Sequence, residues 1–306
     1  MGRTEAKRGK INGKEASPAK RLREEAIDTM EETASKRYVF WNNKGGVGKS
    51  TLLFHCAVLY ARAHEDESVL VVDMCPQASV SSTLLTESDG QGKILRDGGD
   101  RVQELSTVTK NKPCPKTIVG YLMKRLAGEH PPVDHFITHL SEENSSLPSN
   151  LYLVCGDQYL DLIATTLDAQ RRVPDTPVFS NWVSVTYYLR DLIGRIAEAR
   201  GGQWTVFIDT NPAFTVYTQL AIAAGNRLVI PFNADDYSRR AVDNLLDHVY
   251  GRIHVAEPYQ NFNAKSFASE AGTHRLNLPR VHLLIHNRAT VYSTRAANAY
   301  AAKWRA

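Results

Sequence analysis

The 306-residue sequence has few cysteines and lacks any long apolar run. Its four cysteines, Cys56, Cys75, Cys114 and Cys155, are scattered without paired spacing, which argues against a disulfide scaffold and against a zinc module. No apolar stretch approaches the roughly 20 residues that a membrane-spanning helix needs, and the first residues lack the apolar core of a secretory signal. We therefore expect a reduced, cytoplasmic protein without a membrane anchor.

Acidic residues are absent from the last part of the chain. Residues 271–306 contain six Lys and Arg residues and no Asp or Glu, whereas residues 38–270 carry a net negative charge. An asymmetry of this kind suggests an anionic partner such as nucleic acid. A solvated basic surface explains the same charges equally well.

The chain divides into a polar segment and one domain. Residues 1–37 are rich in Lys, Glu, Ala and Arg and cannot bury much apolar surface, so we expect a flexible basic N-terminal arm. Residues 38–306 form a single expected domain, in which short apolar runs alternate with helical patterns. We interpret the segment between residues 86 and 115, which lacks a strong period, as a surface loop.

The order of the expected elements predicts the fold class. The expected strands are residues 38–41, 69–72, 151–154, 205–208, 227–230 and 281–285, and the expected helices are residues 50–63, 118–127, 159–169, 182–199, 216–224 and 239–250. Nearly continuous apolar strands are typical of a parallel sheet that is covered on both faces. The alternation therefore predicts a doubly wound α/β fold with a mostly parallel, twisted sheet.

A glycine-rich loop follows the first expected strand and leads into a helix. Its sequence over residues 42–51 is N-N-K-G-G-V-G-K-S-T. Backbone N–H groups at such a turn converge on one point, with the positive end of the helix dipole behind them, and thus bind phosphate. Lys49 supplies a charge to the β- and γ-phosphates, and the Ser50 hydroxyl is a Mg²⁺ ligand. The predicted nucleotide-binding residues of the loop are Lys44, Gly45, Gly46, Val47, Gly48, Lys49, Ser50 and Thr51.

The K-G-G-V-G-K-S sequence resembles the deviant Walker A box of the ParA/MinD ATPases, and most closely the ParA-like ATPases that partition plasmids and chromosomes. Asn43 replaces the first glycine of the general P-loop pattern, and Lys44 matches the signature lysine of the family. The resemblance implies a P-loop NTPase fold, with ATP and Mg²⁺ bound. It also implies a homodimer that forms on ATP binding, in which Lys44 reaches the nucleotide of the other subunit.

Two further motifs extend the resemblance. Asp73 ends the second expected strand and matches the first acid of the family's D-x-D-P-Q motif, with Pro76 and Gln77 setting the register. Cys75 replaces the second acid, which in the family positions the attacking water. A thiol with an ordinary pKa of about 8.5 is mostly neutral and does not replace a carboxylate. The catalytic set implied by the resemblance is Lys44, Lys49, Asp73 and Cys75, with slow hydrolysis because of Cys75.

Asp209 ends a later strand and resembles the family's Walker B acid, with Asn211 in place of the first proline that follows. The predicted Mg²⁺ residues are therefore Ser50, Asp73 and Asp209. Asn287, just after the last expected strand, is placed by the resemblance where an adenine-contacting residue lies. The likeness extends from about residue 38 to residue 291.

The resemblance implies non-specific DNA binding by the ATP-bound dimer, association with the nucleoid, and a ParB-like or cargo-adaptor partner. The candidate DNA contacts are chosen by charge and position, and they are Arg239, Arg240, Arg275, Arg280, Arg288 and Arg295. The alternative hypothesis is a regulator that hydrolyses ATP poorly and whose ATP-bound dimer binds a protein. Cys75 favours this alternative, because a slow switch holds the ATP-bound state.

Overall fold

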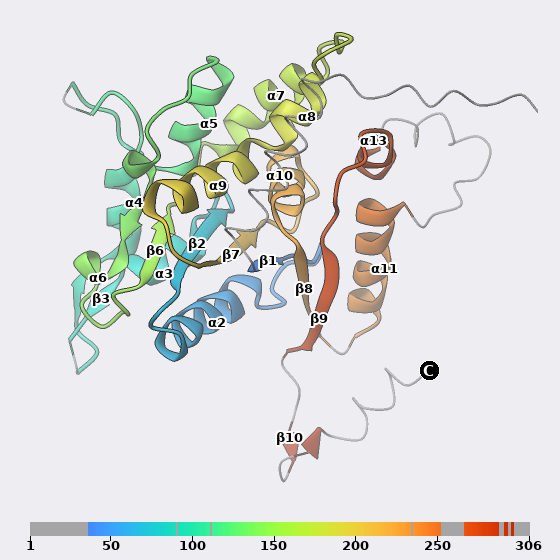
Figure 1. The fold of residues 1–306 in the computed structure, drawn as a ribbon. Helices are drawn as coiled ribbons and strands as arrows, with labels where there is room; N and C mark the ends of the chain where they lie inside the picture. The colour runs from blue at the N-terminus through green and yellow to red at the C-terminus, as the bar shows by residue number, and fades with distance from the viewer. Residues whose placement is uncertain are drawn as a thin grey trace, which may run out of the picture.

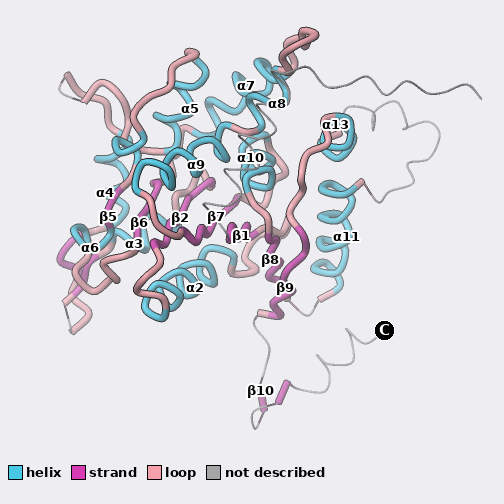
Figure 2. Tube along the Cα trace, in the orientation of Figure 1, coloured by secondary structure: helices cyan, strands magenta, loops and turns pink. Residues whose placement is uncertain are grey.

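The computed structural model describes residues 36–89, 91–110, 112–233, 235–251 and 266–287, together with the backbone of a short hairpin at 291–292 and 295–296 (Figure 1, Figure 2). Residues 1–35 of the expected N-terminal arm, and Arg288, lie outside these residues. Strand β1 (Lys36–Phe40) begins two residues before the expected boundary of the arm. Arg37 is buried there, and its Nε donates a hydrogen bond of 2.7 Å to the carbonyl oxygen of Ala224.

A seven-stranded sheet, in the order β5-β6-β2-β7-β1-β8-β9, forms the centre of the described structure. All six predicted strands are present, and they pair in parallel. Their bounds are Lys36–Phe40 (β1), Ser68–Met74 (β2), Leu151–Val154 (β6), Trp204–Thr210 (β7), Arg227–Phe232 (β8) and Arg280–His286 (β9). A two-residue strand, β5 (Thr138–His139), pairs antiparallel with β6 at one edge. The predicted doubly wound α/β fold is confirmed.

Helices cover both faces of the sheet, because side chains of successive strand residues point to opposite faces. On one face, Phe40, Val71 and Phe207 contribute to a core with α2 (Lys49–Ala63), α3 (Ser79–Leu85), α4 (Gly98–Ser106) and α6 (Leu140–Glu143). On the other face, Val39 and Ile208 belong to a larger core. Its helices are α5 (Ile118–Leu126), η1 (Val133–Phe136), α7 (Leu160–Arg171), α8 (Asn181–Thr186), α9 (Tyr188–Arg200), α10 (Val216–Ala224), α11 (Asp236–Tyr250) and α13 (Phe267–Thr273).

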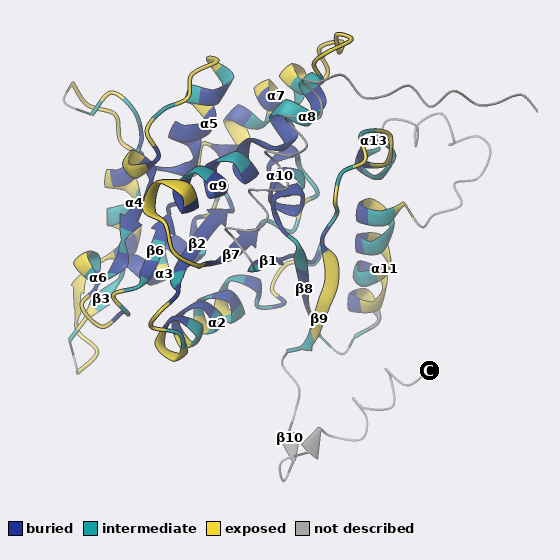
Figure 3. Ribbon diagram, viewed as in Figure 1, coloured by how far each residue is buried: buried dark blue, intermediate teal, exposed yellow. Residues whose placement is uncertain are grey.

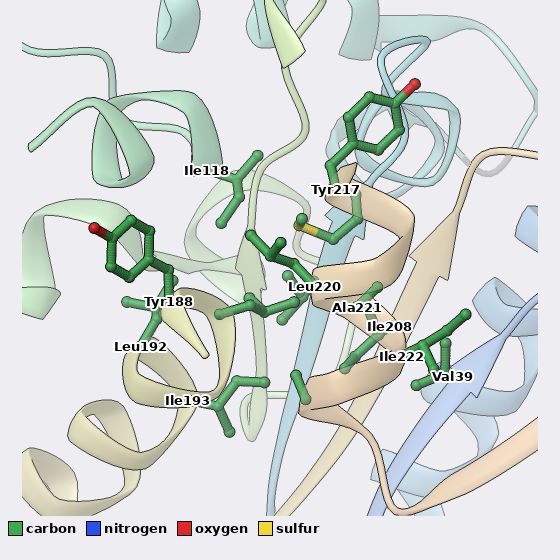
Figure 4. Packing of buried hydrophobic residues seen from close by; sticks show 14 of the residues in the cluster. Val39, Ile118, Tyr188, Leu192, Ile193, Ile208, Tyr217, Leu220, Ala221 and Ile222 are labelled. Carbon is green, nitrogen blue, oxygen red and sulfur yellow. The ribbon is translucent and has the colours of Figure 1, made fainter. Parts of the chain in front are cut away.

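Helix α10 carries much of the larger core. Figure 4 shows Leu220, Ala221 and Ile222 of α10 between the sheet residues Val39 and Ile208 and the helix residues Leu192 and Ile193 of α9. All but one of the helix's nine residues are buried, which the sequence indicates by its almost uninterrupted apolar run. The Thr218 hydroxyl of α10 also donates a 2.8 Å hydrogen bond to the carbonyl oxygen of Ala213, in the loop after β7.

The expected surface loop at residues 86–115 is wrong in part. It contains a hairpin of β3 (Glu87–Ser88) and β4 (Ile94–Arg96), followed by α4. The Asp97 side chain caps α4 by accepting hydrogen bonds from the backbone of Gly99 and Asp100, which is the usual way to satisfy N–H groups at a helix start. The expected helix at 182–199 is divided at Tyr187 into α8 and α9.

Strand β9 differs from the central strands in its exposure. Val281, Leu283 and Leu284 are exposed on this edge strand (Figure 3). Helix α11 contacts α13 and the neighbouring strand β8 (Figure 1).

None of the helices in the described part of the chain combines the length and the apolar character that a membrane span needs.

Candidate functional site

The motif residues meet at the carboxyl end of the parallel strands, where open α/β sheets bind ligands. The glycine-rich loop follows β1, Asp73 lies near the end of β2, and Asp209 lies near the end of β7. Asp73 and Asp209 are direct neighbours across the β2–β7 pair. The topology therefore brings together residues that are more than 130 positions apart in the sequence.

The loop has the backbone of a phosphate site. Gly46 and Gly48 have φ values of 70° and 88°, in the left-handed region that favours glycine. A Cβ built on Gly48 would overlap the amide nitrogen of Asn287. No side chain of the described residues caps the start of α2, and its first turn has no acidic residue. The N–H groups and the positive end of the helix dipole are thus left for an anion.

Lys49 is buried against the glycine-rich loop from which it extends. The residue is buried, and its Nζ donates a hydrogen bond of 3.2 Å to the carbonyl oxygen of Lys44. Burial lowers the pKa of the Lys49 amine, while the carboxyl of Asp209 and the thiol of Cys75 oppose this effect. Lys49 and Asp209 therefore interact electrostatically, with the Cys75 thiol nearby.

Ser50 and Asp209 form a pair that fits a Mg²⁺ site. The Ser50 hydroxyl donates a 2.6 Å hydrogen bond to Oδ2 of Asp209. Asp209 is fully buried, and its Oδ1 has no hydrogen-bond partner among the described residues. Burial, and next the nearby carboxyl of Asp73, raise the pKa of Asp209. A hydroxyl and an unpaired carboxylate oxygen are donors that Mg²⁺ accepts, so these residues fit the ion.

Asp73 has an internal role in this structure. Its carboxylate accepts hydrogen bonds from the backbone N–H of Cys75 (3.0 Å), and from both the N–H (3.0 Å) and the hydroxyl (2.7 Å) of Ser81. Burial raises the pKa of Asp73, while these bonds oppose the rise. Asp73 thus fixes the loop between β2 and α3, and its expected roles in Mg²⁺ binding and catalysis stay predictions.

Cys75 is a neutral group beside the phosphate loop. Its side chain is only 5% exposed. Burial, and then the Asp73 carboxyl, raise the pKa of the Cys75 thiol to about 12. The thiol is therefore protonated at physiological pH and does not act as a base.

The Lys44 side chain contacts residues at the start of α11. Its Nζ lies 2.7 and 2.6 Å from the two carboxylate oxygens of Asp235 and 3.2 Å from the hydroxyl oxygen of Ser238. Asp235 also caps α11, because its side chain accepts the backbone N–H of Ser238. Asp235 is not among the site residues expected from the sequence. The sequence signal that Asp235 does carry is that of a helix cap, because Asp is favoured at a helix start, and this signal does not point to Lys44.

Asn287 closes the other side of the loop. Its side-chain nitrogen donates a 2.9 Å hydrogen bond to the carbonyl oxygen of Val47, and its backbone N–H donates to Phe232. The expected adenine contact of Asn287 stays a prediction. Behind the site, Asn211 donates to the Tyr217 hydroxyl at 3.1 Å, and this hydroxyl donates to Asp161 at 2.7 Å. The sequence analysis did not identify these last two residues.

The candidate DNA-binding arginines do not form one cluster. Arg239 and Arg240 are exposed in the first turns of α11, at the carboxyl edge of the sheet. Arg280 is exposed at the amino end of β9, and Arg275 precedes it, so this pair lies toward the opposite edge. Arg295 belongs to β11 (Arg295–Ala296), where only the backbone is described.

Comparisons with known proteins agree with this arrangement. The model of the AAA_31 family, described as an AAA domain, matches residues 35–257. A search of curated protein sequences gave no match.

Several solved structures share the fold. Apo McdA of Cyanothece is similar with a TM-score of 0.56 and 16% identity, over 88% of this chain and 78% of that chain. The ATP complex of a McdA variant from Cyanothece has a TM-score of 0.55 and 17% identity, over 88% and 76% of the two chains. Protein DIP2308 of Corynebacterium diphtheriae has a TM-score of 0.53 and 18% identity, over 79% and 71%.

Proposed function

Because the chain belongs to the AAA_31 family and is a ParA/MinD-type P-loop ATPase, we propose that it is an ATP-dependent partitioning or positioning ATPase. In this proposal, ATP and Mg²⁺ close two subunits around two nucleotides, and the dimer binds DNA without sequence preference. A ParB-like or cargo-adaptor protein triggers release. Hydrolysis by the protein alone is slow.

The observation that carries the proposal is the pair of lysines on one phosphate loop. Lys49 is buried inside the loop, whereas the Lys44 side chain leaves it and is partly exposed. In this proposal, only Lys49 therefore binds the phosphates of its own subunit. The second is the type of group that a sandwich dimer requires, and the ATP-bound McdA variant is a solved example of nucleotide on this fold.

Each residue of the site has a defined task in this mechanism. The loop N–H groups and Lys49 bind the β- and γ-phosphates, and Ser50 and Asp209 hold Mg²⁺. The ion, when bound, neutralises charge on the phosphates. Lys44 of each subunit reaches the nucleotide of the other. Gly48 keeps the backbone close to the phosphates, because its φ of 88° lies in the left-handed region that favours glycine.

We expect slow turnover because Cys75 stands where the family has its second acid. Phosphoryl transfer to water depends on positioning the water and on electrostatic stabilisation. Cys75 is neutral and buried, and Asp73 is occupied by Ser81 and the Cys75 N–H. We therefore expect the ATP-bound dimer to persist until a partner acts on it.

The test is ATP turnover measured with and without DNA, together with dimerisation of Lys44→Ala. Lys44→Ala is expected to bind ATP as a monomer with unchanged affinity and to lose ATP-dependent dimers in light scattering. Normal dimerisation of this variant would contradict the trans role of Lys44. DNA binding is expected to need ATP and to fall about a thousandfold between 50 and 200 mM salt if about six phosphates are neutralised.

A second candidate function is a nucleotide-gated regulator whose ATP-bound dimer binds a protein. Cys75 is the observation that favours it, because a switch with no aligning carboxylate is held in the bound state. Turnover that stays negligible with DNA, combined with ATP-dependent dimers that do not bind DNA, would support this alternative. DNA binding by the ATP-bound dimer would support the partitioning ATPase.

A further inference from the structure

All the hydrogen-bonding capacity of the Lys44 ammonium is used within its own subunit. The group has three N–H donors, and it has three close acceptors: both oxygens of Asp235 and the hydroxyl of Ser238. The ring centroid of Tyr237 lies 6.0 Å from Nζ. The ammonium thus cannot hold these partners and contact a second subunit at the same time.

The backbone that carries Lys44 is held in place, so only its side chain has to move. Asn42 is fully buried; its side-chain oxygen accepts the N–H of Lys44 at 2.9 Å, and its side-chain nitrogen donates to the carbonyl oxygen of Pro231 at 2.8 Å. On the opposite side, Asp235 is fixed as the cap of α11. The ion pair therefore joins the phosphate loop to the start of the helix that carries Arg239 and Arg240.

We propose that Asp235, with Ser238, is an intrasubunit latch that holds Lys44 in the monomer and so raises the protein concentration at which the ATP-bound dimer forms. The inference rests on the proposed function, in which Lys44 acts across the dimer. On dimerisation each Lys44 exchanges Asp235 for the partner's nucleotide. Asp235 is a positioning residue in this scheme and does not itself contact the nucleotide.

The size of the effect follows from the exposure of the pair. The Lys44 and Asp235 side chains are 26% and 37% exposed, so water screens their attraction. Exposed ion pairs change an equilibrium by about 1.4- to fivefold. Since a symmetric dimer opens two latches, we expect removal of the latch to lower the dimer dissociation constant by roughly two- to 25-fold.

The test compares Asp235→Asn with Asp243→Asn, a control at an exposed position of the same helix. Asparagine remains a good helix cap, so Asp235→Asn removes the charge and keeps the start of α11. In the nucleotide-free monomer, acetylation of Lys44 by an amine-reactive reagent is followed by mass spectrometry. Dimerisation is then measured by analytical ultracentrifugation with a slowly hydrolysed ATP analogue at 0.1 and 1 M salt.

We expect faster Lys44 acetylation and tighter dimers in Asp235→Asn, and no change in the control. Both differences should shrink at 1 M salt, where the Debye length falls to about 3 Å. An unchanged acetylation rate would overturn the latch. Faster acetylation with unchanged or weaker dimers would also overturn it, since Asp235 would then support Lys44 in the dimer. If the unmodified protein binds the analogue and never dimerises, the proposed function is wrong. The latch is then wrong as well, because there is no dimer whose formation it could oppose.

Discussion

Replacing Cys75 by aspartate should raise ATP turnover at least tenfold. The thiol lies near Lys49 and Asp209, and its raised pKa of about 12 keeps it neutral. A carboxylate at this position supplies the acceptor that aligns water for attack on the γ-phosphate. Groups of this kind contribute about 10²–10⁴-fold to a rate. We expect the lower part of this range, because Asn211 also departs from the family pattern.

The same substitution should also lower the stability of the folded protein, and the structure gives the direction of this effect. Asp73 and Asp209 are already fully buried neighbours, and each is harder to ionise because of its burial. A third carboxylate, only 5% exposed at position 75, adds like-charge repulsion. The nucleotide-free Cys75→Asp protein should therefore unfold at a lower temperature than the unmodified protein. Mg²⁺ and ATP should recover part of the difference, because both bind only the folded state and the Mg²⁺ ion brings positive charge to the acids.

The assay is phosphate release at saturating ATP, with ATP affinity measured separately by calorimetry. Cys75→Asn is the matched control, because it resembles aspartate in size and carries no charge. It should bind ATP and gain no turnover. The reasoning is refuted if Cys75→Asp folds and binds ATP but hydrolyses no faster than the asparagine control. Brisk hydrolysis by the unmodified protein would refute it too, since another group would then align the water.

Three further predictions concern the loop, the buried acids and the arginines. Lys49→Ala should lose nearly all ATP affinity, because it removes the cation that faces the β- and γ-phosphates; undiminished affinity in calorimetry would contradict the P-loop assignment. Asp209→Asn should raise the thermal stability of the nucleotide-free protein at pH 8, because a buried carboxylate is no longer charged. The gain should disappear as the pH falls from the raised folded-state pKa of Asp209 towards the ordinary value of 3.8, since the carboxyl is then protonated in both states; a gain that does not depend on pH would argue against this cause. Charge reversal is made at Arg239 with Arg240 and, in a second variant, at Arg275 with Arg280. The variant that binds DNA more weakly in fluorescence anisotropy, and does so for all sequences alike, identifies which end of the strands faces DNA. If both double variants bind DNA as tightly as the unmodified protein does, these arginines are not part of the DNA interface.

Sequence alone was sufficient where the physical signal is local. Buried parallel strands such as residues 151–154 read as short apolar runs, because both faces of each strand are covered. The phosphate loop is equally local, since its glycines, its lysine and the following helix are consecutive. The acids at positions 73 and 209 could be placed at one edge because parallel strands all end there.

Only the tertiary structure decided how these residues are used. Lys44 pairs with Asp235 across 191 positions of sequence, and no local pattern specifies which of the many acids in the chain meets that ammonium. Asp73 looks like a free catalytic acid in its motif, yet Ser81 and the Cys75 N–H occupy its oxygens. The basic residues look like one set by charge, but Arg239 and Arg280 lie toward opposite edges of the sheet. The physical reason is that periodicity and motif spacing report whether a segment is buried. Which acid pairs with Lys44, and at which end of the strands each arginine lies, depends on how β8, α11 and β9 are arranged in space.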